Sequence, residues 1–133
     1  MPVDDFIAAW NARDPNAVAA CFTPGGVRVA LAYPETRYEG RDALVEHVGG
    51  LMSTWPDCTL AVRAVTSADD GTVTCEWTWA GTQQADYGPL PGKGQALELK
   101  GVSVLEMDGD LIREERVYWD TGTLMASAGL FPE

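Results

Sequence analysis

The chain has 133 residues, a length that fits one domain built around a single hydrophobic core. Lys and Arg number 9 and Asp and Glu number 20, which gives a formal net charge of -11. That balance repels phosphate backbones and anionic membrane surfaces, so it argues against nucleic-acid binding. A hydrophobic content of 46% excludes a disordered chain. We therefore expect one folded domain over residues 1–133.

The cysteines give no sign of a metal or thiolate site. Cys21, Cys58 and Cys75 are widely spaced without a CxxC pair, and His47 is the single histidine. We expect no metal, and we interpret the cysteines as small buried apolar residues. The N-terminus has no basic segment before a long apolar run, and no stretch is long enough to cross a bilayer. The sequence thus predicts a cytoplasmic protein with no membrane contact.

The first half of the chain predicts helices. Apolar residues recur at helical spacing over residues 3–10 and again over 41–52. Asp14-Pro15 is typical of the cap and first residue of a second, short helix, and residues 27–33 form a candidate strand. Trp55-Pro56 ends the third helix, because a residue before proline avoids the helical region.

The second half changes to the period of strands. Residues 58–67, 72–82, 95–107 and 111–120 read as strands joined by turns or a Pro/Gly loop, and a short helix closes the chain. This order predicts an α+β fold, with three helices packed on one face of a strongly curved, mostly antiparallel sheet. Such a sheet forms a cone, and a cone lined by aromatic and apolar side chains is typical of a small-molecule site.

Three stretches carry a family resemblance: "GRDALVEHV", "WAGTQQADYGPLPGKG" and "GDLIREERVYWDTGTLMASAGLFP". With the helical start, they make nearly the whole chain similar to the nuclear transport factor 2-like superfamily, the cystatin-like cone fold shared with ketosteroid isomerase. Within it, the chain most resembles the SnoaL-like polyketide cyclases. The resemblance implies an enzyme without metal or cofactor, in which Asp120 moves a proton during an intramolecular aldol-type ring closure.

Two positions depart from that family pattern. Polyketide cyclases usually have a histidine after the central Gly-Thr, where this chain has Gln83, and often a second one four residues before the aspartate, where it has Arg116. Both departures argue against polyketide cyclisation as the activity. They do not change the expected fold or the expectation that Asp120 lies in the pocket.

The last strand carries the candidate catalytic residues. Arg116, Tyr118 and Asp120 alternate along it and therefore share one face, opposite Glu115, Val117 and Trp119. In a cone, Asp120 would be a desolvated general base, and Tyr118 would donate a hydrogen bond to a developing enolate.

Each of these roles has a structural alternative. Asp120 directly precedes the last helix and could simply cap it. Arg116 could hold Asp120 ionised or bind a substrate carboxylate, or it could form an ion pair with Glu114 or Glu76.

Large aromatic residues and the histidine are candidates for the pocket wall. Any one tryptophan is as well explained by core packing, and a lone helical histidine can be a boundary residue rather than an acid or base. The candidates for substrate binding are Trp10, Tyr33, Tyr38, His47, Trp77 and Trp79.

The leading hypothesis is a small cofactor-independent isomerase or cyclase that acts on a hydrophobic carbonyl compound, polyketide-like or cyclic. Alternatives are a non-catalytic ligand-binding or dimeric scaffold protein, and an epoxide hydrolase, which would need a second aspartate besides Asp120. We also expect a homodimer formed through the open face of the sheet.

Overall fold

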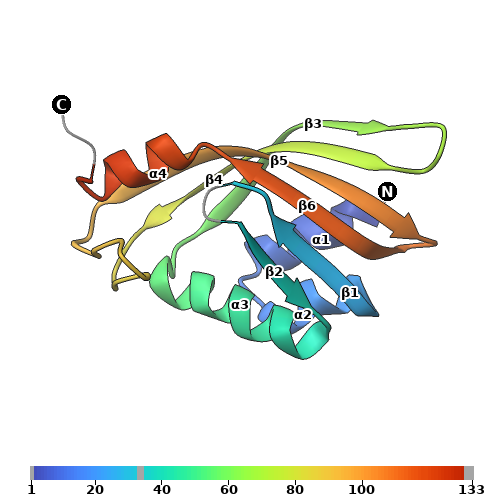
Figure 1. The fold of residues 1–133 in the computed structure, drawn as a ribbon, viewed down its shortest axis with the longest axis horizontal. Coiled ribbons are helices and arrows are strands. Elements are labelled where there is room, and N and C mark those ends of the chain that lie inside the picture. Colours follow the sequence, from blue (N-terminus) through green and yellow to red (C-terminus); the bar gives the residue numbers. More distant parts are fainter. Residues whose placement is uncertain (1, 33–34, 131–133) are drawn as a thin grey trace.

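The computed structural model describes residues 2–32 and 35–130, and Figure 1 shows their arrangement. Four helices and six strands follow one another along the chain: α1 Pro2–Asn11, α2 Pro15–Ala20, β1 Phe22–Ala30, β2 Thr36–Glu39, α3 Arg41–Thr54, β3 Thr59–Ser67, β4 Val73–Thr82, β5 Ala96–Asp108, β6 Leu111–Trp119 and α4 Thr121–Ser127.

The six strands form one sheet in the order β2-β1-β6-β5-β4-β3. The pairing of β1 with β6 is parallel, and the other four pairings are antiparallel. The helices α1, α2 and α3 lie on one side of this curved sheet (Figure 1). The predicted α+β cone with a mostly antiparallel sheet is confirmed, and α4 is the short closing helix expected from the sequence, a fourth helix besides the three packed on the sheet.

Local sequence explains the start and end of the helices. Asp14 caps α2 by accepting a hydrogen bond from the Ala17 amide at 3.1 Å, and Pro15 begins that helix. Helix α3 ends at Thr54, and its cap residue Trp55 has left the helical region, as expected for a residue before proline.

The first strand is longer than predicted. It begins at Phe22 rather than at Val27, and its pairing with β6 shifts register between these two residues. Gly26 makes the irregular start possible, because a Cβ there would lie 2.8 Å from Cβ of Phe22. The short strand β2 was not predicted, since four residues are too few to show a period of two.

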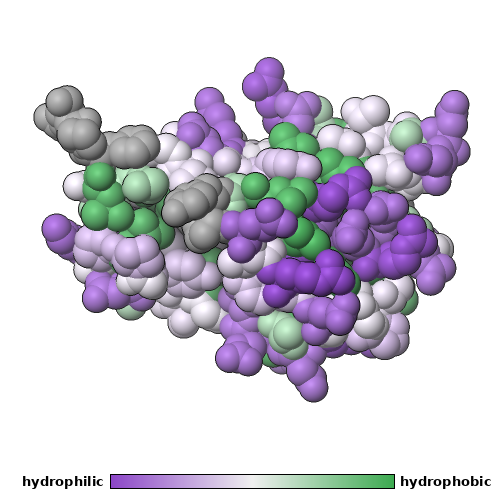
Figure 2. All heavy atoms as spheres, in the orientation of Figure 1, coloured by the Kyte–Doolittle hydropathy of each residue, from purple (hydrophilic) through white to green (hydrophobic). Residues whose placement is uncertain are grey.

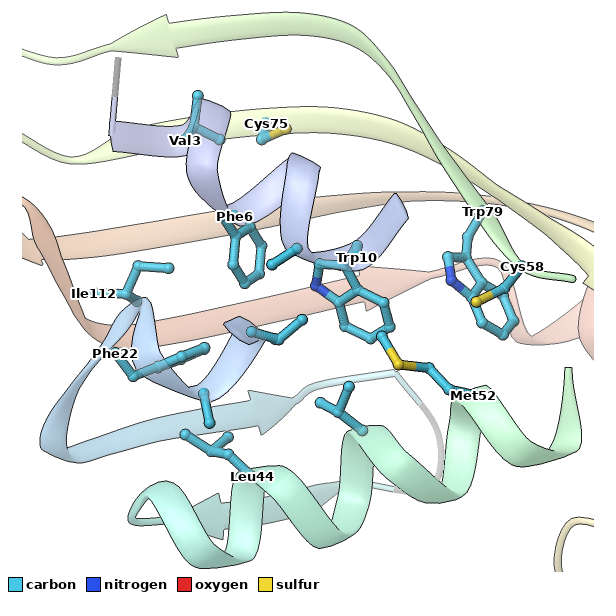
Figure 3. Close-up of a cluster of buried hydrophobic side chains, with 14 of the residues drawn as sticks. Val3, Phe6, Trp10, Phe22, Leu44, Met52, Cys58, Cys75, Trp79 and Ile112 are labelled. Carbon is cyan, nitrogen blue, oxygen red and sulfur yellow. The ribbon is translucent and has the colours of Figure 1, made fainter. Parts of the chain in front are cut away.

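The core lies between α1, α3 and the concave side of the sheet. Figure 3 shows Val3, Phe6 and Trp10 projecting from α1 into this space. The Phe6 ring meets the rings of Trp10 and Phe22 edge-on, at centroid distances of 6.4 and 6.0 Å. Burying such large rings is the main source of stability available to a domain of this size.

Hydrophilic side chains cover much of the face shown in Figure 2, with hydrophobic surface at the end that carries α4. Within residues 2–32 and 35–130, no helix has both the length and the apolar character that crossing a bilayer requires.

Candidate functional site

A cavity of about 100 Å³ lies inside the core, lined by residues of α4, the C-terminal end of α3 and the loop 83–95 as well as by residues of α1 and the sheet. We call it the inner cavity. Its walls come from both helices and sheet, and they are Phe6, Trp10, Arg28, Leu51, Trp55, Leu60, Cys75, Trp77, Trp79, Tyr87, Leu97, Leu99, Ser103, Glu115, Trp119 and Leu124.

Seven of the sixteen lining residues are aromatic. Trp55, at the end of α3, meets Trp79 of β4 edge-on at 5.3 Å and the ring of Tyr87 at 5.5 Å. Trp10, Trp77 and Trp79 all line the inner cavity, where the alternation along β4 and the spacing in α1 placed them. Such walls suit a flat, hydrophobic ligand.

One buried ion pair, between Arg28 and Glu115, borders this apolar space. The Arg28 guanidinium donates from Nη1 to Oε1 of Glu115 at 2.7 Å, and the Ser103 hydroxyl donates to Oε2 at 2.6 Å. The indole of Trp77 in turn donates to Oγ of Ser103 at 3.0 Å. We call these four residues the Glu115 network.

The sheet itself builds the Glu115 network. Arg28 and Glu115 are register partners in the parallel pair of β1 and β6, so both side chains leave the same face of adjacent strands. Ser103 comes from β5, on the other side of β6. The exposed fractions of Arg28 and Glu115 are only 7% and 1%, so these charges can be buried only because they compensate each other.

Burial and these charges set the protonation of the neighbours. Burial, with Glu115 and Glu76 adding to it, raises the pKa of Cys75 to about 11, so this cavity-lining thiol stays neutral. Burial, together with the positive charge of Arg28, lowers the pKa of His47 to about 3. His47 is therefore a neutral imidazole at physiological pH.

Asp120 lies outside the inner cavity. Its side chain is exposed and caps α4, with Oδ1 accepting from the Thr123 amide at 3.2 Å and Oδ2 from the Thr123 hydroxyl at 2.7 Å. These bonds lower the pKa of the Asp120 carboxyl. The prediction that Asp120 faces the cone is wrong, and the alternative that it caps the last helix is confirmed.

Arg116 and Tyr118 share that outward face, as the alternation along β6 required. Arg116 forms ion pairs with Glu106 and Glu114, so the ion-pair alternative holds, but outside the cone. Tyr118 is 45% exposed. The prediction that Arg116 and Tyr118 share one face of β6 was correct. The prediction that this face lines the cone was wrong, because Glu115, Val117 and Trp119 point inward instead.

Two further candidates are not part of the wall of the inner cavity. Tyr38 of β2 and His47 of α3 stack with ring centroids 3.8 Å apart and planes at 11°. Neither belongs to the lining residues. Tyr33 lies outside the described residues.

Residues 3–115 match the SnoaL-like domain family, and this stretch includes Arg28, Ser103 and Glu115. The chain belongs to the SnoaL-like domain family. A search of curated proteins found no match.

Solved structures agree with this SnoaL-like fold. A hypothetical protein with a ketosteroid isomerase-like fold from Catenulispora acidiphila DSM 44928, in complex with trimethylamine, superposes with a TM-score of 0.84 at 21% identity, over 98% of this chain and 94% of the other. A proposed SnoaL-like polyketide cyclase from Jannaschia sp. CCS1 gives 0.82 at 21% identity, over 98% and 91%. IdmH, a proposed polyketide cyclase from Streptomyces antibioticus, gives 0.79 at 18% identity, over 96% and 96%.

Within this SnoaL-like chain, Gln83 holds a loop. Its buried amide donates from Nε2 to the carbonyls of Ala85 and Leu90, at 3.0 and 2.9 Å, and its Oε1 accepts from Gln95 at 3.0 Å. This ties together the loop that brings Tyr87 to the inner cavity. The residue that departs from the cyclase pattern therefore has a structural task.

Sequence reasoning missed the Glu115 network. A signal was present, because Glu115 interrupts the inward face that it shares with Val117 and Trp119, and a carboxylate on an apolar face needs a buried partner. That partner, Arg28, is far away in the sequence, so spacing alone could not find it. In the part of the chain that the structure describes, no three His, Cys, Asp or Glu side chains gather as a metal site would need.

Proposed function

We propose that this SnoaL-like protein is a small cofactor-independent enzyme of the isomerase or cyclase type, which transfers a proton on a hydrophobic carbonyl compound in the inner cavity. The observation that carries the proposal is the Glu115 network, a buried carboxylate in the wall of an otherwise apolar, aromatic cavity. The role first assigned to Asp120 moves to Glu115, since an acid that caps an exposed helix cannot reach a substrate in the cavity.

The proposed reaction is proton abstraction and return. The Glu115 carboxylate takes a proton from the carbon next to the carbonyl, and the electron pair of the broken C–H bond moves to the carbonyl oxygen as an enolate. The positive charge of Arg28 favours this extra negative charge in a site with little water. The proton then returns to carbon, so Glu115 is regenerated and no other reactant is required.

A non-catalytic ligand-binding protein is the second candidate. It is favoured by the bonds that Glu115 already makes, because both of its carboxylate oxygens accept a hydrogen bond inside the protein. An epoxide hydrolase has less support, since it would use two aspartates around an arginine. Among the described lining residues, Glu115 is the one carboxylate.

The size of the inner cavity limits the ligand. Pockets for drug-sized ligands usually measure about 300 Å³ or more, and a cavity of about 150 Å³ binds benzene. A volume of about 100 Å³ is smaller than that benzene-binding cavity, so the ligand is limited to about one ring, and even one ring requires some movement of the walls. This favours a small cyclic carbonyl compound over a multi-ring polyketide.

The test measures by NMR, in D2O, how fast the α-protons of cyclohexanone and cyclohexane-1,4-dione exchange for deuterium. The wild type should accelerate exchange, and Glu115→Gln should slow it by about 100-fold or more. Because Glu115→Gln leaves Arg28 buried without its partner, the double variant Arg28→Gln/Glu115→Gln, which removes both charges, keeps the experiment interpretable if the single variant unfolds.

Asp120→Asn is the matched control, since it alters an acid that directly follows β6 and lies outside the cavity, and its exchange rate should match the wild type. Exchange at the wild-type rate by folded Glu115 variants would contradict the mechanism. If the wild type bound the ketones but caused no exchange, the proposed enzyme would be refuted and the non-catalytic ligand-binding protein would remain.

We also propose a homodimer through the outer face, the sheet face that carries Arg116 and Tyr118. A shallow depression there contains Tyr118 and Val102 together with Arg63, Lys100 and Glu76. A face with an exposed aromatic ring and charges of both signs can pair with a second copy of itself.

A further inference from the structure

The ring of Trp77 is packed against a glycine on the neighbouring strand. Trp77 of β4 and Gly101 of β5 are register partners, so both positions belong to the inner face of the sheet. A Cβ added to Gly101 would overlap the six-membered edge of the indole and would lie 2.6 Å from the carbonyl oxygen of Tyr118. Glycine is therefore required here, because its bare backbone leaves the space in which the indole lies against β5.

This placement brings the indole N–H to Ser103, two residues further along β5. Nε1 of Trp77 donates to Oγ of Ser103 at 3.0 Å, and Ser103 is 2% exposed. The Ser103 hydroxyl donates to Oε2 of Glu115 at 2.6 Å, a short distance typical of a hydrogen bond to a charged carboxylate. Gly101 and Ser103 share the inner face of β5, because side chains alternate along a strand. One strand thus fixes both the edge and the N–H group of the indole.

The Trp77 N–H group determines which way the Ser103 hydroxyl points. A serine hydroxyl has one proton to donate and two lone pairs to accept with, whereas an indole N–H can only donate. The bond from Trp77 occupies a lone pair of Oγ, so the single hydroxyl proton is directed away from the indole and toward the Glu115 carboxylate. A hydrogen bond to the charged form of an acid favours that form. Trp77 therefore favours ionised Glu115 by acting through Ser103.

We propose that Trp77 is a positioning residue for Glu115, which fixes the Ser103 hydroxyl in the orientation that donates to the carboxylate. This inference rests on the proposed function, because it gives Trp77 a part in the same proton transfer. In that reaction Glu115 takes a proton from carbon and gives it back. By favouring the carboxylate, Trp77 and Ser103 keep the resting enzyme in its basic form and favour return of the proton to carbon.

The test is a titration of the Glu115 carboxyl group by 13C NMR, with the signal assigned by its absence from Glu115→Gln. Trp77→Phe keeps a ring beside Gly101 and removes the N–H group, so the midpoint of the Glu115 titration should rise by about 0.5 pH unit. Ser103→Ala removes the donor itself, and the midpoint should rise by about 1 unit or more, as expected for the loss of one hydrogen bond to a charged group.

Two further variants separate positioning from a general change in the wall of the cavity. In the double variant Trp77→Phe/Ser103→Ala, the midpoint should lie within about 0.2 unit of that of Ser103→Ala, because the hydroxyl through which Trp77 acts is gone. Trp79→Phe makes the same substitution at the next inward position of β4. The indole nitrogen of Trp79 has no acceptor among the described residues, so this variant should keep the wild-type midpoint.

An unchanged midpoint in Trp77→Phe would overturn the inference, as would an equal rise with and without the Ser103 hydroxyl, or an equal rise in Trp79→Phe. The pH of half-maximal ketone exchange should rise in Trp77→Phe by the same amount as the Glu115 midpoint. Absence of exchange by the wild type would refute the proposed enzyme. The titration uses no substrate, so it would still decide whether Trp77 acts on Glu115 through Ser103.

Discussion

His47 shows how a single side chain can be tuned without being catalytic. Its ring stacks on Tyr38, and burial and the Arg28 charge lower its pKa to about 3. In the unfolded chain the same imidazole has a pKa of about 6.5. As pH falls below about 6.5 the unfolded state takes up this proton, whereas the folded state does not do so until about pH 3. Low pH therefore favours unfolding through His47.

We predict that the free energy of unfolding falls between pH 7 and pH 5, by up to about 1.4 kcal/mol per pH unit from His47 alone. His47→Phe keeps a ring for Tyr38 to stack on and cannot titrate, so it should lose less stability over this interval. Urea denaturation at pH 7, 6 and 5 measures the difference. Carboxylates with lowered pKa, such as Asp57 and Asp120, titrate below this interval. Equal slopes for the two proteins would contradict the assignment.

At the scale of elements, the loop 83–95 depends on one buried side chain. Gln83 donates to Ala85 and Leu90 and accepts from Gln95, so it replaces the backbone pairing that a strand would have supplied. The loop in turn contributes Tyr87 to the wall of the inner cavity. The stability of the loop and the shape of the cavity are therefore linked.

We predict that Gln83→Ala lowers the free energy of unfolding by about 2–4 kcal/mol, because it removes three hydrogen bonds and leaves buried polar groups unpaired. Gln84→Ala, which changes an exposed neighbour of the same residue type, should cost less than about 0.5 kcal/mol. Urea denaturation of both variants gives the comparison. Similar values for the two would show that the Gln83 network does not hold the loop.

Most elements of this fold could be predicted from local patterns, the short strand β2 being the exception, and the orientation of the last strand could not be predicted. Alternation along β4 placed Trp77 and Trp79 correctly in the wall of the cavity. In β6 each face carries an acid and an aromatic residue, so alternation alone could not distinguish Glu115 and Trp119 from Asp120 and Tyr118. The distinction is made by Arg28 on β1, which is 87 residues away from Glu115 in the sequence.

At the scale of the whole molecule, the outer face of the sheet is the surface with no helix against it. Tyr118 is 45% exposed there, next to ion pairs between Arg116 and the acids Glu106 and Glu114. The net charge of -11 means that two copies repel each other at long range. Salt screens this repulsion, so dimer formation should be favoured at higher ionic strength.

We predict a dimer at micromolar concentration in sedimentation or light-scattering measurements. Tyr118→Asp should raise the dissociation constant by about tenfold or more, because it replaces the exposed ring with a charge that repels its counterpart. Asp69→Asn, on the turn between β3 and β4, changes an exposed acid away from this surface and should have no effect. A wild-type monomer at these concentrations would exclude the proposed interface.

The position of β6 also has a consequence for biosynthesis. Among the strands that the structure describes, it comes last in the chain, yet it lies between β1 and β5 and links β2-β1 to the rest of the sheet. Until the ribosome has released residues 111–119, Arg28 lacks its ion-pair partner Glu115 and the sheet exists as two separate pieces. Folding must therefore wait for its central strand, and such long-range pairing makes folding slow and cooperative rather than stepwise from the N-terminus.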